Sequence, residues 1–497
     1  MTVLVMCFGA MMTFLQITTS AAALSAIQDD LLVGPATLVW IPSSYTLPVA
    51  TFVLTAATLG NRFGRRRLFV AGVVVMMAGS LLLIAGGSLA AAIAGQFVAG
   101  VGGALILPNS LAILGDAFPD PHRRTEVITL WAASSGIGLA IGPVVAGALL
   151  EITSWHAVFL PTAALGAVTV AGARLWVPES RGPAARLDLP GVVLGTIAVA
   201  APVYAAIEGD HLLAAVPVTI LAVAGFIVVE RRSPAPMLDL RLFRSASFAG
   251  VLVVAAIAMF GFTGVAIIEA LFFERAQGLS ALHMGYRLLV LFGVYIAAAG
   301  LAGPLVRHAG FKAPMAAGLV VAAGGCLGLM TQHAGTGFGS AWAYFAVLGA
   351  GCGLVVSPST AAALAGVPAA QVGAASGIVN TIRQLGSVLG SALLGALLAR
   401  RLLAELPGEL AGRAVPAAVG DQVTAAVADG RSGGGQLPPA VRMAIGDAFV
   451  SGVNAVLVVT AIVFLLGAVV VLTLVRNRPH EEHRAPAARP DARSSTA

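Results

Sequence analysis

The sequence predicts an all-α polytopic membrane protein with fourteen transmembrane helices. Apolar runs of about twenty residues recur along the whole chain, and each is long enough to cross a hydrocarbon core of roughly 30 Å. Only 10% of the residues are charged and the mean hydropathy is +0.95, whereas a soluble protein of 497 residues needs far more charge to cover its surface. The runs are apolar on all sides, which argues against a large soluble helical protein.

Apolar runs taken in order divide the chain into two sets of seven expected spans. The first seven lie at 3–27, 37–60, 68–87, 89–114, 127–150, 156–176 and 189–207, and the second seven at 212–230, 249–273, 284–306, 313–332, 340–365, 372–398 and 447–475. The first run lacks a basic segment before it, so we expect a retained helix rather than a cleaved signal peptide.

The distribution of positive charge predicts that both termini are cytoplasmic. With the N-terminus inside, the loops that then face the cytoplasm hold most of the 28 Lys and Arg residues. Positive charge stays on that side because it is hard to move across the membrane during insertion. The formal charge of +6 therefore reports topology, and no nucleic-acid partner is expected. Cys7, Cys326 and Cys352 lie within apolar runs without a CxxC pair, so neither a disulfide nor a metal site is expected.

Two segments are predicted to lie outside the membrane. Residues 399–446 are expected to form a long extracellular loop with some helical potential before a Gly-rich stretch. The tail at 479–497 is polar and rich in Pro, Ala and Arg, and is expected to be disordered.

An internal repeat divides the remainder of the chain. "LGNRFGRRR" follows the second span and "AGPLVRHAGFK" follows the tenth, so that Gly64 aligns with Gly310 at an offset of 246 residues. This offset predicts a six-helix bundle at 1–180, two inserted helices with their linkers at 181–245, and a second six-helix bundle at 246–478. The residues of interest in these two loops are Asn61, Arg62, Gly64, Arg65, Arg66, Gly303 and Gly310.

Two helices carry further motifs. The fifth span reads "SSGIGLAIGPVVAGALL", in which Gly138, Gly142 and Gly147 allow close helix packing and Pro143 bends the helix. The thirteenth span reads "GAASGIVNTIRQLGSVLGSALLG".

Together these motifs resemble the major facilitator superfamily, in particular its fourteen-helix drug:proton antiporter family. The loop after the second span resembles the family's G-x-L-x-D-R-x-G-R-R, the fifth span its antiporter motif, and the thirteenth span its corresponding helix through Asn380, Arg383, Gln384 and Gly386. The resemblance covers essentially the whole chain and implies a major facilitator fold arranged as 6+2+6 helices. It also implies export by alternating access around a midplane site, with the two repeated loops as candidate gating loops.

At three positions where the family has a charged residue, this chain has a neutral one. Gln16 stands where the first helix often has Asp, Asn61 where the loop motif has Asp, and Gln96 where the fourth helix has Arg. Each replacement keeps a hydrogen-bonding side chain but cannot titrate.

A proton-coupled carrier needs a buried carboxylate, and the expected spans offer two candidates. Glu269 lies well inside the ninth span, and Glu274 lies near the outer end of the same run. The alternative for Glu269 is a structural pair with Arg287 or a misplaced helix edge. Polar residues within apolar helices are the candidates for the substrate cavity: Gln16, Thr19, Gln96, Asn109, Ser134, Ser135, Asn380, Arg383 and Gln384. A cavity of amides and hydroxyls suits neutral or amphipathic molecules better than polycations.

The sequence thus predicts a secondary transporter of a bacterial plasma membrane that exports small organic molecules, drugs or endogenous metabolites. We expect a monomer in the lipid bilayer that is not an enzyme and uses no cofactor or metal, with the proton gradient as the energy source. Two alternatives stay open at this point. One is an uncoupled or weakly coupled facilitator, and the other is a transporter-derived sensor or scaffold. A primary pump is disfavoured because the sequence lacks a Walker motif.

Overall fold

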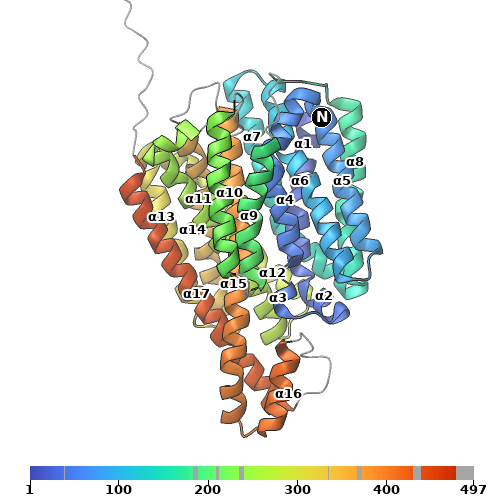
Figure 1. Cartoon of the computed structure of the whole chain (residues 1–497), viewed down its shortest axis with the longest axis vertical. Helices are drawn as coiled ribbons and strands as arrows, with labels where there is room; N and C mark the ends of the chain where they lie inside the picture. Colours follow the sequence, from blue (N-terminus) through green and yellow to red (C-terminus); the bar gives the residue numbers. More distant parts are fainter. Residues whose placement is uncertain are drawn as a thin grey trace, which may run out of the picture.

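A computed structural model describes residues 1–38, 40–182, 189–208, 212–233, 240–333, 335–365, 372–428 and 438–476. Long, roughly parallel helices account for nearly all of these residues, and the described ranges hold no strand (Figure 1). The apolar side chains of the helices pack in two large buried clusters, one mostly in the first half of the chain and one mostly in the second.

The first half forms a bundle of six long helices. α1 packs against α7, α6 and α8, while α5 packs against α6 and α8, and α4 against α6. The expected first span is divided, because α1 ends at Ala22 and a short helix follows it. The elements of this half are α1 (Thr2–Ala22), α2 (Leu24–Leu31), α3 (Pro35–Leu38), α4 (Trp40–Phe63), α5 (Arg65–Ala85), α6 (Leu89–Ala117), α7 (Pro121–Ile152), a 3-10 turn at Trp155–Phe159 and α8 (Leu160–Trp176).

The second half repeats this architecture. α12 packs against α14, α11 against α15, and α13 against α14 and α17. Its elements are a 3-10 turn at Leu240–Arg244, α11 (Ala246–Leu271), a π-helical turn at Phe272–Ala276, α12 (Ala281–Ala309), α13 (Lys312–Leu329), α14 (Phe338–Leu364), α15 (Val372–Gly412), α16 (Ala417–Ala428) and α17 (Pro439–Leu474).

The two halves meet along two seams. α7 packs against α12 in one seam, and α4 packs against α15 in the other. The inserted helices α9 (Leu189–Glu208) and α10 (Leu212–Arg232) pack on each other, and α9 contacts both α4 and α15. They therefore cover the second seam on the front of the molecule in Figure 1. The rings of Trp40 and Tyr204 lie 5.9 Å apart at this contact.

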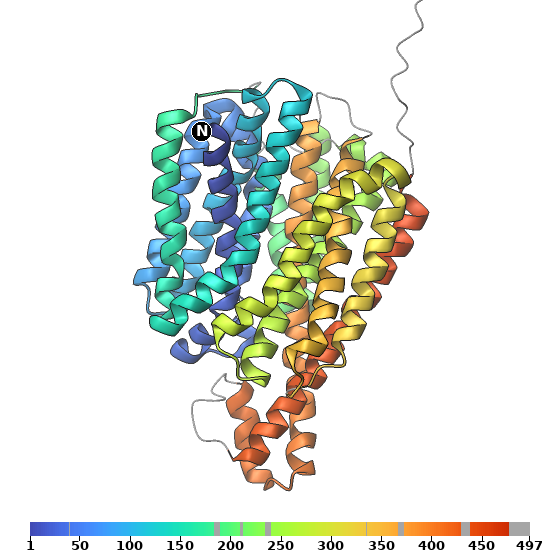
Figure 2. The same cartoon turned by 180° about the vertical axis from the view of Figure 1, so that it is seen from behind.

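The two ends of the bundle differ in shape. We call the end at which α1 begins the N-terminal end, and the opposite end, at which α16 projects from the second half, the cap end (Figures 1 and 2). The cap consists of the last turns of α15, α16 and the first turns of α17. Leu402, Leu406 and Leu410 of α15 are buried in it. Arg413 joins the cap by ion pairs to Glu409, at 2.5 Å, and to Asp447.

The cap corrects the expectation of a long loop at 399–446. α15 continues to Gly412 and α17 begins at Pro439, so most of this segment is helical. The cause is the spacing of apolar residues every four positions beyond residue 398, which gives α15 a buried stripe outside the expected span. Most of the Gly-rich stretch and the tail at 479–497 lie outside the described residues.

Eleven helices in the described ranges are long and apolar enough to cross a membrane. α4, α9 and α10 coincide with three other expected spans and are 24, 20 and 21 residues long. The chain is thus all-helical with many candidate spans, as the hydropathy pattern predicted. The expected domain boundaries at 180 and 245 stay predictions.

Candidate functional site

The loop between α4 and α5 is held by contacts within the first half. The guanidinium of Arg65 donates to Oδ1 of Asn61 from Nε at 3.1 Å and from Nη2 at 2.9 Å. Its Nη1 donates to the carbonyl of Ala112 at 3.3 Å and pairs with Asp116 of α6. Asn61 therefore supplies the acceptor that an acid would have supplied, and Asp116 supplies the negative charge.

A second anion, Glu179 in the segment after α8, anchors the start of α5. Its Oε1 accepts from the backbone N–H of Arg66 at 3.0 Å, and its Oε2 lies 3.7 Å from Nε of both Arg66 and Arg67. Gly64 makes this approach possible, since its φ is +112° and a Cβ there would lie 2.7 Å from Glu179. The other arginine, Arg62, stacks on the ring of Phe63 at 5.3 Å.

The repeated loop shares the glycine conformation. Gly310 ends α12 with a φ of +70°, so both aligned glycines occupy the left-handed half of backbone space. Gly303 lies within α12, and a Cβ there would meet no atom of the described residues. The gating role of these residues is a prediction; their described contacts are those of two tight helix connections.

The glycines and proline of α7 divide between two neighbours. A Cβ on Gly138 would overlap the carbonyl of Met11 in α1, and one on Gly142 would overlap the hydroxyl of Thr18. Gly147 instead touches the backbone of Leu282 in α12. On the same seam, a Cβ at Gly285 of α12 would lie 2.7 Å from the carbonyl of Pro143. The motif thus packs α7 onto its own bundle and onto the other half.

Two of the neutral replacements bond to each other inside the first half. Nε2 of Gln16 donates to Oε1 of Gln96 at 3.2 Å, and Nε2 of Gln96 donates to Oγ of Ser20 at 2.5 Å. All three side chains are buried. This amide pair joins α1 to α6 without any charge.

The remaining cavity candidates of the first half bond mainly to backbone carbonyls. Thr19 donates to Leu15 at 2.8 Å, and Ser134 and Ser135 donate to Trp131 at 2.7 and 3.1 Å. Asn109 donates to Leu105 at 2.8 Å and to Ala56 of α4 at 3.3 Å. These contacts give Asn109 a role in packing α6 onto α4.

The candidates of α15 lie in the second half. Asn380 and Arg383 are half-buried, and Gln384 is buried. The Arg383 guanidinium lies beside the hydroxyl of Tyr295 in α12. Two nitrogen atoms, Nε of Arg383 and Nε2 of Gln384, have no hydrogen-bond partner among the described residues.

Glu269 is fully buried in α11 and is not paired with Arg287. Neither of its carboxyl oxygens has a hydrogen-bond partner in the described ranges. The amide of buried Gln332 faces the carboxyl without a bond of good geometry. Arg287 instead stacks on Phe273 and Phe338, at 5.1 and 5.2 Å from the ring centres. The alternative of a Glu269–Arg287 pair is therefore wrong.

At the cap end, polar contacts join the two halves. Arg275, in the π-helical turn after α11, donates from Nη2 to Oε1 of Gln28 at 2.8 Å and to Oδ1 of Asp29 at 2.9 Å. In the seam between α7 and α12, the Ser280 hydroxyl at the start of α12 donates to Glu151 of α7 at 2.9 Å. The two halves are thus closed against each other at this end.

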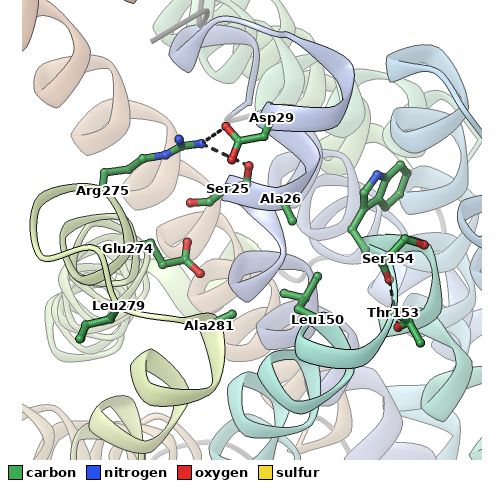
Figure 3. Close-up of a pocket in the computed structure, with 11 residues that line it drawn as sticks. Ser25, Ala26, Asp29, Leu150, Thr153, Ser154, Glu274, Arg275, Leu279 and Ala281 are labelled. Carbon is green, nitrogen blue, oxygen red and sulfur yellow. Dashed lines mark hydrogen bonds and ion pairs between the residues drawn. The ribbon is translucent and has the colours of Figure 1, made fainter. Parts of the chain in front are cut away.

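A pocket of about 400 Å³ lies within this closed interface (Figure 3). Both halves line it, with residues from α2, from the end of α7 and the segment after it, and from the turn between α11 and α12 with the start of α12. The lining residues are Ser25, Ala26, Asp29, Leu150, Thr153, Ser154, Trp155, Glu274, Arg275, Leu279 and Ala281.

This pocket holds one of the predicted site residues, Glu274, and none of the nine cavity candidates. The midplane cavity stays a prediction. Sequence reasoning missed Asp116, Glu179 and Arg275 as partners in the site, although all three are charges at the ends of apolar runs, which was the available signal.

Comparisons with known proteins agree with this architecture. A sequence profile of the Major Facilitator Superfamily matches residues 6–391. The chain is 30% identical to the tetracenomycin C resistance and export protein of Streptomyces glaucescens over 98% of this chain and 93% of that protein. It is 32% identical to the multidrug resistance protein Stp of Mycobacterium tuberculosis (strain CDC 1551 / Oshkosh) over 76% of this chain and 72% of the relative.

Among solved structures, a bacterial homologue of the human lysosomal transporter Spinster, in an inward-facing and occupied conformation, superposes with a TM-score of 0.66. The alignment has 14% sequence identity and covers 95% of both chains, so it shows a shared fold. The profile match spans well over half of the sequence, and the chain therefore belongs to the Major Facilitator Superfamily of multi-pass membrane transporters.

Proposed function

We propose that this protein exports small amphipathic organic molecules from a bacterial cell by alternating access, driven by protons that bind Glu269. The proposal includes fourteen spans in the plasma membrane, a monomeric carrier and cytoplasmic termini. The cap end then faces outward. Two relatives whose names include export or multidrug resistance support the export role.

The observation that carries proton coupling is the isolation of the Glu269 carboxyl. An ionised carboxylate without a counter-charge is costly in a fully buried position, and a proton removes that cost. In the closed cap-end conformation, Glu269 is the only Asp or Glu within the two six-helix halves that is fully buried in the described ranges. A change in its surroundings when the halves rock would release the proton.

The test is substrate flux in proteoliposomes with and without a pH gradient. We would assay the wild type, Glu269→Gln and a matched control, Glu405→Gln, which removes an exposed carboxyl from the cap portion of α15. Tetracenomycin C and ethidium serve as probes. We expect the gradient to accelerate flux at least tenfold in the wild type and in the control, but not in Glu269→Gln. Equal flux in all three proteins, with or without the gradient, would refute coupling through Glu269.

A facilitator is the second candidate, and the amide pair of Gln16 and Gln96 is the observation that favours it. This pair fills the polar interior of the first half without a titratable group. A facilitator would equilibrate the probes across the membrane without responding to the pH gradient. A sensor or scaffold would bind a probe and move none.

A further inference from the structure

We propose that the cap-end pocket binds small amphipathic amines from the outer solution, and that a bound amine holds the carrier closed at that end. The inference rests on the outward orientation of the cap end and on alternating access, both parts of the proposed function. The site is separate from the predicted midplane cavity.

The size and walls of the pocket fit a compact apolar body. Its volume of about 400 Å³ falls in the range of small-molecule sites. Leu150, Leu279 and Ala281 give it apolar walls. Asp29, at its edge, is exposed, so the pocket opens to solution.

The charges around the pocket select a cation. Arg275 neutralises Asp29, whereas Glu274 makes no ion pair among the described residues although it lines the pocket. The hydroxyl of Ser25 lies beside this carboxylate and can accept a further hydrogen bond. Glu151 adds negative charge at the neighbouring start of α12. An ammonium group is thus drawn to the mouth and can pair with Glu274, with its apolar body against the walls.

Because the pocket lies between the two halves, a bound ligand affects the equilibrium between the closed and open conformations. Ser25 and Ala26 belong to the first half, and Glu274 and Leu279 to the second, so the walls separate when the cap end opens. A ligand that requires both walls binds the closed conformation alone and shifts the equilibrium toward it. At ten times its dissociation constant, it multiplies the closed-to-open ratio by about eleven. Because export requires opening at this end, occupancy inhibits export.

Calorimetric titration of the purified protein in detergent tests the binding site. The probes are 1-naphthylmethylamine and its uncharged analogue 1-naphthalenemethanol, which differ in the ammonium group. We expect the amine to bind at least tenfold more tightly than the alcohol to the wild type. Glu274→Gln should remove this difference, and Ala26→Phe, which fills the pocket, should abolish binding of both probes. Glu151→Gln, which alters a carboxyl outside the pocket lining, should retain most of the preference.

Equal affinity of the two probes for the wild type would overturn the site, as would amine binding unchanged in both Glu274→Gln and Ala26→Phe. If Glu274→Gln does not fold, as judged by gel filtration, Ala26→Phe still decides whether the pocket is the place of binding.

Inhibition is tested with wild-type proteoliposomes that receive the amine or the alcohol on the outer side. The amine should slow ethidium export at least fivefold at ten times its dissociation constant, and the alcohol at the same concentration should not. Binding without inhibition would overturn the closing effect. Absence of export for every probe would count against the proposed function, while the calorimetric result would still decide the binding site.

Discussion

At the scale of single residues, two side chains near the loop after α4 share the roles of hydrogen-bond acceptor and counter-charge for Arg65, which one acid could fill alone. Asn61 accepts two hydrogen bonds from Arg65, and Asp116 on α6 balances the charge. The loop motif allowed the turn at Gly64 and the arginine cluster to be predicted. It could not reveal Asp116 or Glu179, because these partners come from positions 51 and 113 residues away, where only the fold brings them near.

Moving the negative charge from position 116 to position 61 tests this division of roles. Asp116→Asn leaves Arg65 without its anion, and since the arginine side chain is only 13% exposed we expect a loss of about 1 kcal/mol in unfolding free energy. Adding Asn61→Asp should recover most of that loss, because the residue already faces the guanidinium. Thermal unfolding in detergent measures both effects. A double variant less stable than Asp116→Asn would contradict this assignment.

The turn glycine gives a second prediction. Gly64→Ala should lower the unfolding free energy by roughly 1–2 kcal/mol, since a side chain is strained at a φ of +112° and its Cβ would press on Glu179. Gly115→Ala is the control, because a Cβ on that helical glycine meets open space. Equal melting temperatures for the two variants would show that the turn has relaxed.

At the scale of elements, α7 links packing inside one bundle with packing between bundles. Its motif glycines were recognisable from spacing, but the division of Gly138 and Gly142 toward α1 and of Gly147 toward α12 depends on helix rotation. Small residues recur throughout this sequence, so the pattern alone does not tell which neighbour each one meets. In the cap, the sequence did carry the signal for a helix, because Leu402, Leu406 and Leu410 recur every four residues and are buried. The helix was not predicted there because these residues lie beyond the end of an expected span.

Enlarging a seam glycine should separate the halves. Gly147→Val places methyl groups against the backbone of Leu282, so we expect at least a tenfold loss of ethidium export from a protein that still elutes as a folded monomer. Gly293→Val is the control on α12, where a Cβ would meet no atom of the described residues, and its export should be unchanged. Similar export by both variants would mean that the seam tolerates the added volume.

At the scale of the whole molecule, the offset of 246 residues aligned two glycines, Gly64 and Gly310, that share a positive φ. The loop motif, together with those of the fifth and thirteenth spans, placed the chain in a superfamily whose profile matches residues 6–391. The contacts that close the cap end could not be predicted in this way. Arg275 and Asp29 are far apart in sequence and belong to different halves, so their pairing reports the conformation of the molecule as well as its fold.

Breaking that pair should open the cap end. In a background with its three cysteines replaced by alanine, we would place a cysteine at Ala26 and label it from outside with a membrane-impermeant thiol reagent. Arg275→Gln should raise the labelling rate about fivefold, the equivalent of roughly 1 kcal/mol for a partly exposed ion pair. Arg413→Gln is the control, because it breaks ion pairs confined to the cap of one half.

The charge exchange Asp29→Arg with Arg275→Asp should return labelling toward the starting rate. Acceleration by Arg413→Gln equal to that by Arg275→Gln would show that the labelling reports loosening of the second half alone.

The length of α15 and α17 has a mechanical consequence. These helices, of 41 and 36 residues, run without interruption from the interior of the second half into the cap. The last twenty residues of α15 extend about 30 Å, so a rotation of the bundle by roughly 10° displaces the tip by about 5 Å. The cap therefore moves farther than the rest of the bundle when the second half tilts. A fluorophore on the cap, paired with one on α2, would report individual transport cycles as changes in the distance between the two dyes.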